Sequence, residues 1–248
     1  MSEFTALILA AGLGLRMGPR GKLVPKGLIE MGGRALVPQS VDTLRRAGVT
    51  RIAVVTGHLA EQYQEVFAGT DIQIIHNPDY ATTGSLRTLA TGLAACAGPV
   101  LILESDLVYA PQVLTGLEPS RNSFTVSGPT QAGDEVYTWV RDDRLIEISK
   151  DRNARPEPPL GEMIGITALT AAATSTMQGV AQRVLAEAPE AHYEQGLVAL
   201  AQEVEIACPF LGDIAWAEVD DEQMLARARA EVYPAIEAAR RAAWKGIE

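Results

Sequence analysis

The sequence predicts an α/β protein built on a doubly wound, mostly parallel sheet. The apolar run at residues 5–10 stops at a glycine-rich loop, which is typical of a strand buried on both faces of a parallel sheet. From there to residue 106, apolar strands alternate with amphipathic helices, which indicates βαβ crossovers. From about residue 122, strand patterns follow one another with short links, which predicts an inserted antiparallel β arm.

Each further element is predicted from its own pattern. In the first half, apolar runs predict strands and one-sided apolar spacing predicts helices: strands 51–57, 72–77 and 100–106, and helices 35–48, 59–67 and 85–97. In the second half, the same signals predict strands 123–128, 135–140, 144–149, 163–169 and 214–220, and helices 173–187 and 192–203. Asp142-Asp143 reads as a hairpin turn and 151–162 as an exposed loop. We expect one domain over 1–248, with an acceptor-side insertion at about 122–170 and C-terminal helices over 222–248 separated at Pro234.

Composition and charge favour small-molecule chemistry. The chain has 248 residues, 47% of them hydrophobic, and its net charge of -10 argues against a surface that coats nucleic acid. Cys96 and Cys208 lie in apolar stretches without metal-ligand spacing, so we expect two buried thiols. The first residues lack a basic segment and no apolar run is long enough for a membrane span, so we expect a cytoplasmic protein.

The loop after the first strand has the composition of a phosphate-binding loop. Glycines allow close backbone approach to a ligand, and Arg and Lys neutralise phosphate oxygens. The loop holds both kinds: Gly12, Gly14, Gly18 and Gly21 with Arg16, Arg20, Lys22 and Lys26. A Walker A loop is excluded because Leu23 follows Gly21-Lys22, and a dinucleotide-binding GxGxxG is disfavoured because residue 17 is Met17.

The pattern LAAGxGxRM over Leu9–Met17, followed by Pro25-Lys26, resembles the opening of the nucleotidyltransferases. The resemblance implies a Rossmann-like nucleotidyltransferase fold whose loop wraps a nucleoside triphosphate. It implies that Arg16, Lys22 and Lys26 neutralise the phosphates as catalytic residues. It also implies a nucleotide-binding set from this part of the chain: Leu9, Ala10, Ala11, Gly12, Gly14, Arg16 and Lys22.

Two carboxylates distant in sequence are expected to bind Mg²⁺. Asp106 and Asp220 each end an apolar strand, and ligands bind at the carboxyl ends of strands in open α/β sheets. Asp106 would also contact the nucleotide. The alternative is that either Asp caps the helix that follows, as Asp220-Asp221 before an amphipathic run suggests. Alternation along the strands places Glu104 and Glu218 on the opposite sheet face, where a supporting role stays open.

The middle of the chain resembles the CTP:phosphonate cytidylyltransferases, with the bacterial phosphocholine cytidylyltransferases as near relatives. The segments that carry the resemblance recur in order: 76–89, 103–109, 133–137, Ser149-Lys150, 161–167 and 215–236. The resemblance implies CTP as donor, a CMP-phosphonate product and pyrophosphate as leaving group. It implies nucleotide contacts from Thr83, Gly84 and Ser85, and an acceptor pocket of Asp134, Lys150, Tyr193 and Glu194. Helix capping by Thr83 or Ser85 and simple solvation of the pocket residues are the alternatives.

The acceptor stays open between 2-aminoethylphosphonate, 2-hydroxyethylphosphonate and phosphonoformate, because Arg20 and Gln195 depart from the pattern expected of 2-aminoethylphosphonate enzymes. Phosphocholine or a sugar 1-phosphate is the alternative acceptor, although 5% aromatic residues leave few for a choline cage. A catalytically inactive regulator would be expected to lack one of the site residues. Val232, Ile236 and Ala239 form an apolar stripe that fits the chain's own core or a second subunit, so a homodimer also stays open.

An acceptor that is ionised at pH 7 needs no general base. We therefore expect no proton-transfer role for His58, His76 and His192, and a structural role for His58.

Overall fold

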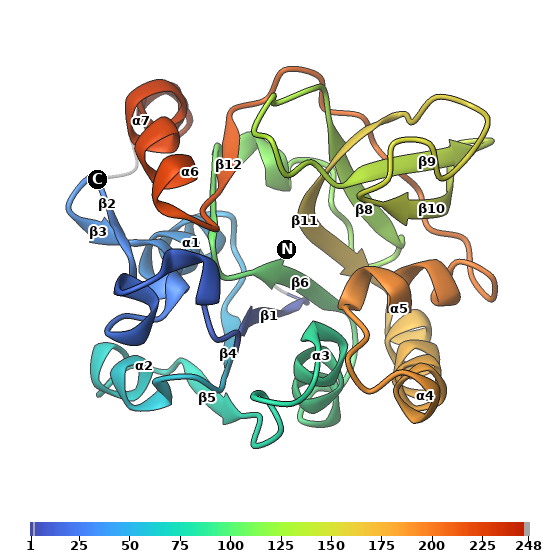
Figure 1. The fold of residues 1–248 in the computed structure, drawn as a ribbon, viewed down its shortest axis with the longest axis horizontal. Helices are drawn as coiled ribbons and strands as arrows, with labels where there is room; N and C mark the ends of the chain where they lie inside the picture. Colours follow the sequence, from blue (N-terminus) through green and yellow to red (C-terminus); the bar gives the residue numbers. More distant parts are fainter. Residues whose placement is uncertain (2, 246–248) are drawn as a thin grey trace.

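A central sheet with helices on both faces organises the chain in a computed structural model that describes residue 1 and residues 3–245 (Figure 1). The strand order is β10-β9-β11-β6-β1-β4-β5, and β8 also pairs with β11. The bounds of these strands are β1 Thr5–Ala10, β4 Arg51–Thr56, β5 Gln73–His76, β6 Val100–Glu104, β8 Ser123–Ser127, β9 Tyr137–Arg141, β10 Arg144–Ser149 and β11 Gly161–Leu169. The predicted α/β class with a mostly parallel centre and additional antiparallel strands is confirmed.

The parallel centre consists of β6, β1, β4 and β5. Strand β1 pairs in parallel with both neighbours, so that Thr5 lies opposite Arg51 on one side and Val100 on the other. The side chains of β1 after Thr5 are buried, because helices cover both faces of the strand. Since these strands run the same way, their carboxyl ends meet at one edge, and the loops that follow them gather there.

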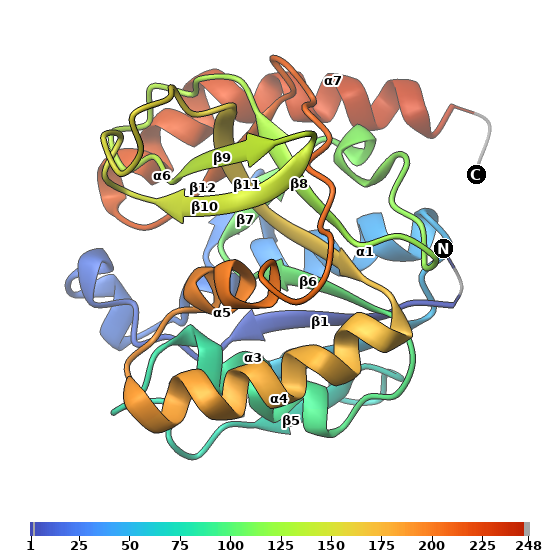
Figure 2. The ribbon, with the colours of Figure 1, turned by 90° about the vertical axis from the view of Figure 1, so that its right-hand side faces the viewer.

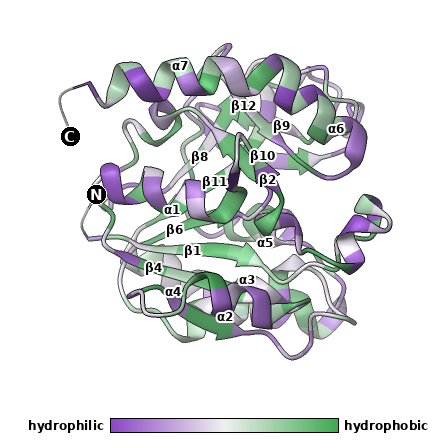
Figure 3. Cartoon of the chain, turned by 90° about the vertical axis from the view of Figure 1, so that its left-hand side faces the viewer, coloured by the Kyte–Doolittle hydropathy of each residue, from purple (hydrophilic) through white to green (hydrophobic). Residues whose placement is uncertain are grey.

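Two helical layers cover the sheet (Figure 2). On one face, leucines of α3 and α5 and Met177 of α4 pack against Leu7 and Val55 of the sheet. On the other face, α1 and α2 contribute Val41, Leu44 and Tyr63, which pack with Ile8 and Val54. The hydropathy colouring shows the apolar strands enclosed between these layers, with hydrophilic residues on the outer sides of α2 and α7 (Figure 3). The bounds are α1 Leu36–Arg46, α2 Ala60–Val66, α3 Ser85–Ala94, α4 Ala171–Glu187 and α5 Tyr193–Leu200.

The antiparallel arm is continuous with the central sheet. Strand β11 pairs antiparallel with β6 as well as with β8 and β9, so the last part of the segment 122–170 belongs to the main sheet. The β9–β10 hairpin turns at Asp142 and Asp143, as predicted, and both have positive φ angles of 51° and 61°. Short polar side chains such as Asp tolerate this left-handed conformation better than most residues.

Two expectations for the C-terminal part are wrong. The predicted strand 214–220 is only β12, Trp216–Glu218, and it lies outside the central sheet: it pairs antiparallel with β7, Leu107–Tyr109. Pro234 does not separate two helices, because a π-helical turn over Ala228–Val232 joins α6, Glu222–Arg227, to α7, Tyr233–Ala243. A proline ring cannot donate to the preceding turn, and the wider π turn accommodates it within one helical run. Residues 246–248 of the predicted C-terminal helices lie outside the described residues.

The helix α7 packs on its own chain. Ile236 is fully buried, and the buried guanidinium of Arg240 donates to Gln39 of α1 at 2.5 Å. The guanidinium of Arg46 lies 4.6 Å from the centre of the Trp244 ring. The stripe that left a homodimer open therefore packs, at Ile236, against the chain's own core. A short hairpin of β2, Glu30–Met31, and β3, Arg34–Ala35, lies beside this helix, where Tyr233 packs on Gly32. None of the described helices is both long and apolar enough to span a bilayer.

Candidate active site

A cleft of about 730 Å³ lies at the carboxyl edge of the parallel strands. Its walls come from the loops after β1, β5 and β6, from the arm and from the start of α5, so segments far apart in sequence meet there. The side chains and backbone that line it include most of the predicted site residues: Leu9, Ala10, Ala11, Gly12, Gly14, Arg16, Lys26, Thr83, Gly84, Ser85, Asp106, Lys150, Glu194 and Asp220.

The glycine-rich loop folds back on itself at the cleft wall. Gly14 has a φ of +62°, a conformation that favours glycine. A Cβ on Gly21 would lie 2.2 Å from the carbonyl oxygen of Gly14, so the two backbones are in direct contact. This fold directs Arg16 and Lys26 into the cleft. The other two cations point elsewhere: Lys22 is exposed beside a separate hollow of about 260 Å³, and Arg20 pairs with Glu222 of α6 at 2.5 Å.

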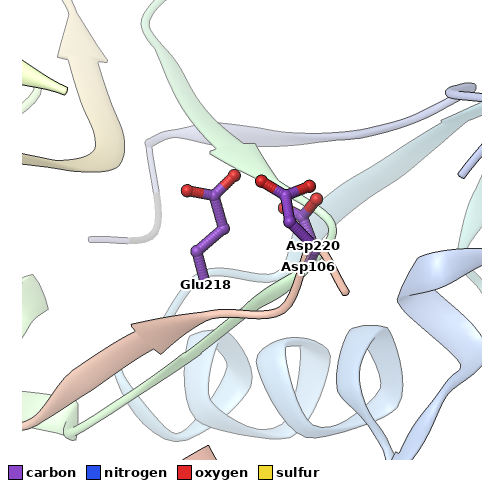
Figure 4. Close-up of side chains that lie close together, drawn as sticks. All are labelled: Asp106, Glu218 and Asp220. Carbon is purple, nitrogen blue, oxygen red and sulfur yellow. The ribbon is translucent and has the colours of Figure 1, made fainter. Parts of the chain in front are cut away.

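Three carboxyl groups converge on one point in the cleft. Oxygen atoms of Asp106, Glu218 and Asp220 all lie within 4.8 Å of one another, and their side chains point toward a common space (Figure 4). The pairing of β12 with β7 produces this convergence, because the backbone N–H of Val219 donates to the Asp106 carbonyl at 3.0 Å. The expectation that Asp220 ends a strand of the open sheet is wrong, but the antiparallel pairing brings it to the same place.

The helix cap that the sequence offered as an alternative role for Asp220 is provided by its neighbour instead. Asp221 is the N-cap of α6, and its carboxylate accepts a hydrogen bond from the Met224 N–H at 2.7 Å. The side chain of Asp220 is therefore free to face the cleft, where only 1% of it is exposed.

Lys26 joins the two predicted metal ligands. Its ammonium donates to Asp106 at 2.9 Å and also contacts Asp220, and only 19% of the side chain is exposed. Burial alone would lower the pKa of Lys26, but the charges of Asp106 and Asp220 outweigh it and raise the pKa well above its ordinary value. The group is thus a permanent cation between two carboxylates, and the site accommodates positive charge.

The ion pairs continue across the cleft to the antiparallel arm. Arg16 binds both Asp220 and Asp134, and Lys150 donates to the second oxygen of Asp134 at 2.7 Å. Burial would raise the pKa of Asp134, but its bonds to Lys150 and Arg16 hold that pKa below its ordinary value. Asp134 does not line the cleft itself. Because it already holds two cations, it is poorly placed to pair with an ammonium group of an acceptor.

Further acidic side chains line the cleft beside Glu218. Glu104, Glu194 and Glu218 line it, and the Glu194 Oε2 is buried without a hydrogen-bond partner among the described residues. Burial first, and the charges of Glu218 and Glu194 second, raise the pKa of Glu104 well above its ordinary value. The carboxylate of Glu104 fits against Gly165, which has a φ of +81° and whose Cβ would lie 2.3 Å from the Glu104 Oε2.

The predicted acceptor residue Tyr193 does not line the cleft. Its side chain is fully buried in the core, where its hydroxyl lies behind the acidic group. Burial raises the pKa of its hydroxyl well above the ordinary value, with the charges of Glu104 and Glu194 adding to the shift. Tyr193 therefore packs in the core behind the cleft wall and does not face the cleft.

The segment predicted to bind the nucleoside joins two cleft walls. The Ser85 hydroxyl accepts from the Tyr193 N–H at 2.9 Å and lies 3.3 Å from His192 Nδ1, while Thr83 donates to the Asp79 carbonyl at 2.8 Å. Neither hydroxyl caps α3, whose N-cap is Gly84 without a side-chain bond. The segment is thus fastened to the start of α5.

Gly84 allows this close contact, and replacing it tests its importance. A Cβ at residue 84 would lie 2.2 Å from the carbonyl oxygens of both Glu190 and Ala191. The backbone of Gly84 has a negative φ, so Gly84→Ala introduces no backbone strain and acts only by pushing the two walls apart. We expect KM for nucleotide and for acceptor each to rise by about tenfold or more, a loss of ~1.4 kcal/mol each. Steady-state kinetics beside Gly179→Ala, a helix position where a Cβ meets nothing closer than 3.5 Å, would show this, and an unchanged KM for both substrates would contradict it.

The sequence predicted Glu104 and Glu218 on the opposite sheet face and did not place Tyr80 or His192 in the cleft, although all four line it. The alternation rule assumes a continued strand, whereas β12 ends at Glu218 and the chain then turns. The only available signal for His192 was its position next to the predicted pocket residues.

Comparison with known proteins identifies the sequence family. A model of the MobA-like NTP transferase domain matches residues 6–243. A CMP-5'-(3-aminopropyl)phosphonate synthase of Streptomyces rubellomurinus is 33% identical over 142 residues, which is 56% of this chain and 23% of that protein. A 2-aminoethylphosphonate cytidylyltransferase of Lancefieldella rimae is 32% identical over 152 residues, 58% of this chain and 60% of that protein. The matches thus span less than two thirds of either relative.

Solved structures share the fold across nearly the whole chain. The CTP:phosphocholine cytidylyltransferase of Streptococcus pneumoniae has a TM-score of 0.75 at 17% identity, covering 92% of this chain and 98% of that one. The inositol-1-phosphate CTP transferase of T. maritima has a TM-score of 0.78 at 16% identity, covering 97% of both chains. With a family model that matches almost all of the sequence and an architecture shared with nucleotidyltransferases, the chain belongs to the MobA-like NTP transferase domain family.

Proposed function

We propose that this protein transfers CMP from CTP to a small aminoalkylphosphonate and releases pyrophosphate. The names of the two relatives above support the reaction, and the cleft supports it chemically. The observation that carries the proposal is that one cleft holds both kinds of charge: Arg16 and Lys26 line it together with the glycine-rich loop, and Glu104 and Glu194 line it beside Glu218. Cations suit the phosphates, and carboxylates suit an ammonium group.

The three convergent carboxylates fit Mg²⁺. Asp106, Glu218 and Asp220 offer oxygen ligands, which hard divalent cations prefer, and the position of Lys26 shows that positive charge is held there. When bound, Mg²⁺ would supply charge neutralisation to the phosphate oxygens. In its presence Asp106 and Asp220 would exchange the ammonium of Lys26 for the metal, which would leave Lys26 available to a phosphate.

The chain's own residues would align the reactants and neutralise charge. An ionised phosphonate oxygen forms a bond to the α-phosphorus of CTP while the bond from that phosphorus to the bridging oxygen breaks and pyrophosphate leaves. No proton moves, because the phosphonate is already ionised at neutral pH. Arg16 and Lys26 would bind the phosphate oxygens on which negative charge grows, and the backbone of the glycine-rich loop would hold the triphosphate in line.

The acidic side chains of the cleft favour one of the acceptors that the sequence left open. Among the described residues, Glu104 and Glu194 form no ion pair and the Glu194 Oε2 has no hydrogen-bond partner, so an ammonium group would complete the site. Phosphonoformate would add negative charge there, and 2-hydroxyethylphosphonate would leave the carboxylates unpaired. Among the described residues, two tyrosines line the cleft, and they lie apart from Glu104 and Glu194: Tyr63 packs against Gly27, and Tyr80 packs near His58 and His76. They therefore form no cage for choline around these carboxylates.

Pyrophosphate release tests the reaction and the choice of acceptor. The purified protein would be assayed with CTP and Mg²⁺ against 2-aminoethylphosphonate, 3-aminopropylphosphonate, 2-hydroxyethylphosphonate, phosphonoformate, phosphocholine and glucose 1-phosphate. We expect an aminoalkylphosphonate to exceed every other acceptor in kcat/KM by tenfold or more, ~1.4 kcal/mol of transition-state preference. Preference for phosphocholine or the sugar phosphate would contradict the proposed acceptor.

Glu194→Gln separates recognition of the amine from the rest of the reaction. The change keeps the shape of the side chain but removes its charge, so kcat/KM for the aminoalkylphosphonate should fall about tenfold or more, while that for 2-hydroxyethylphosphonate should change by less than about threefold. Glu187→Gln, an exposed position on α4, is the matched control. An equal loss of kcat/KM for both acceptors would show that Glu194 does not bind the amine.

A further inference from the structure

We propose that His58 and Gln62 are positioning residues of the glycine-rich loop, which set the affinity for the nucleotide without contacting it. The inference rests on the proposed function, since it assumes that this loop binds the triphosphate. Both residues belong to the junction between β4 and α2, and neither lines the cleft. Nothing in the reaction described above uses them.

Three hydrogen bonds connect this junction to the loop. The backbone N–H of His58 donates to the Ala11 carbonyl at 3.1 Å, at the point where the loop leaves β1. The imidazole Nε2 of His58 lies 2.8 Å from the Gly21 carbonyl, and because a carbonyl only accepts, this nitrogen must donate. The Gln62 amide donates to the Leu23 carbonyl, also at 2.8 Å. The junction therefore holds both the beginning and the far side of the loop.

The loop depends on these bonds because it has little apolar anchorage. Leu15 and Leu23 are 78% and 71% exposed, and Met17 is the buried large side chain of the turn. Gly21 lies directly against the Gly14 carbonyl, and the Met17 N–H donates to that same carbonyl at 3.0 Å. A displacement of Gly21 would therefore also displace Gly14, which lines the cleft, and the turn that carries Arg16.

The backbone of the junction indicates that its geometry is required. Leu59, between the two positioning residues, has a φ of 51°, the left-handed conformation that a leucine rarely adopts. This turn starts α2 directly after His58, so that Gln62 in the first turn of the helix reaches the same loop. Strained residues of this kind persist where the surrounding structure holds them, and they cluster at functional sites. Here the turn brings two donors to the carbonyls on either side of Lys22.

The test compares variants that remove a donor with variants that keep one. His58→Phe keeps a ring without the donor, His58→Gln restores an N–H of similar reach, and Gln62→Met keeps the length of the side chain. We expect His58→Phe and Gln62→Met each to raise KM for CTP and the Kd for CTP in calorimetry without acceptor by about tenfold. At saturating CTP, kcat and KM for the acceptor should stay within about threefold of wild type, and His58→Gln should recover most of the CTP affinity.

Each other outcome overturns the proposal in a recognisable way. Wild-type CTP affinity in His58→Phe would show that the loop does not need the bond. A fall in melting temperature and kcat together, without the selective loss for CTP and without rescue by His58→Gln, would show a purely structural role. If the wild-type protein itself binds no CTP in calorimetry, the proposed function fails and the positioning role fails with it.

Discussion

Asp106→Asn is expected to lower kcat for CMP transfer by about a thousandfold or more while the protein stays folded. The side chain lies among three carboxyl groups whose oxygens are within 4.8 Å of one another, and an amide keeps its shape but not its charge. Losing one anionic ligand weakens the binding of a divalent cation and the neutralisation of charge in the transition state. Asn can still accept the bond from Lys26, so we expect little loss of stability in the absence of metal.

Two measurements check this result together. Pyrophosphate release gives the loss of rate, and thermal unfolding with and without Mg²⁺ gives metal binding, because a ligand that binds only the folded state raises its stability. Mg²⁺ should raise the melting temperature of the wild type and of the control Asp221→Asn, in which Asn still serves as a helix N-cap. A metal-dependent rise that persists in Asp106→Asn would place the metal elsewhere.

Lys26→Met is expected to have the largest effect on stability and to abolish activity as well. The ammonium lies between Asp106 and Asp220, and Asp220 is 1% exposed. Removing the ammonium leaves Asp106 without its cation and Asp220 with Arg16 alone. Breaking a buried ion pair by removing one partner costs about 3–5 kcal/mol. Lys22→Met is the matched control, because Lys22 is exposed and outside the cleft, and its stability should stay near that of the wild type.

The pH dependence of this variant has a definite sign. In the wild type, the pKa of Lys26 is raised, so its contribution to stability is complete below the ordinary lysine pKa and is lost only as the pH rises through the raised value. The contribution of Lys26 to the free energy of unfolding of the wild type should therefore stay constant between pH 6 and pH 9. The charge of Lys26 lowers the pKa of the buried Glu104 and Glu218, which burial and neighbouring carboxylates raise, so in Lys26→Met their pKa rises further and urea unfolding should show the deficit shrinking from pH 8 to pH 5. An equal deficit at both pH values would contradict the account.

Much of the fold could be predicted because its elements carry local signals. The apolar run of β1 and the alternation of strands and helices up to Glu104 identify a parallel sheet, and Asp142-Asp143 marks the hairpin of the arm. The pairing of β12 with β7 could not be predicted, because a three-residue strand carries no information about its partner. The π turn before Pro234 could likewise not be predicted, since the usual effect of proline is to end a helix.

The candidate site was predictable where a residue type and its spacing carry the chemistry. Arg16 and Lys26 belong to a loop whose composition indicates phosphate binding, and Asp106 follows a buried strand, and all three line the cleft. The place of Glu218 among the carboxylates depends on the end of β12, and the burial of Tyr193 depends on how α5 meets the sheet. Both are consequences of tertiary packing that no local pattern contains.

The partners of Asp134 also come only from the folded chain. From the sequence it is an acid near an acceptor pocket, suited to an ammonium group, but the structure pairs it with Arg16 and Lys150. Residues so distant in sequence meet because the arm folds over the glycine-rich loop. Apart from the three carboxyl groups that would hold Mg²⁺, the acidic side chains of the cleft left for the proposed acceptor amine are Glu104, Glu190 and Glu194.

Phosphorus NMR of the reaction mixture tests the central claim most directly, because it identifies the bond that is made. CTP, Mg²⁺ and 2-aminoethylphosphonate or 3-aminopropylphosphonate would be incubated with the wild type and with Asp106→Asn. We predict that the wild type forms inorganic pyrophosphate and an equal amount of a product in which the phosphonate phosphorus is coupled to a phosphate phosphorus through a shared oxygen, and that the variant forms neither. Pyrophosphate with free CMP and unchanged phosphonate, or no reaction with any phosphonate, would contradict the account.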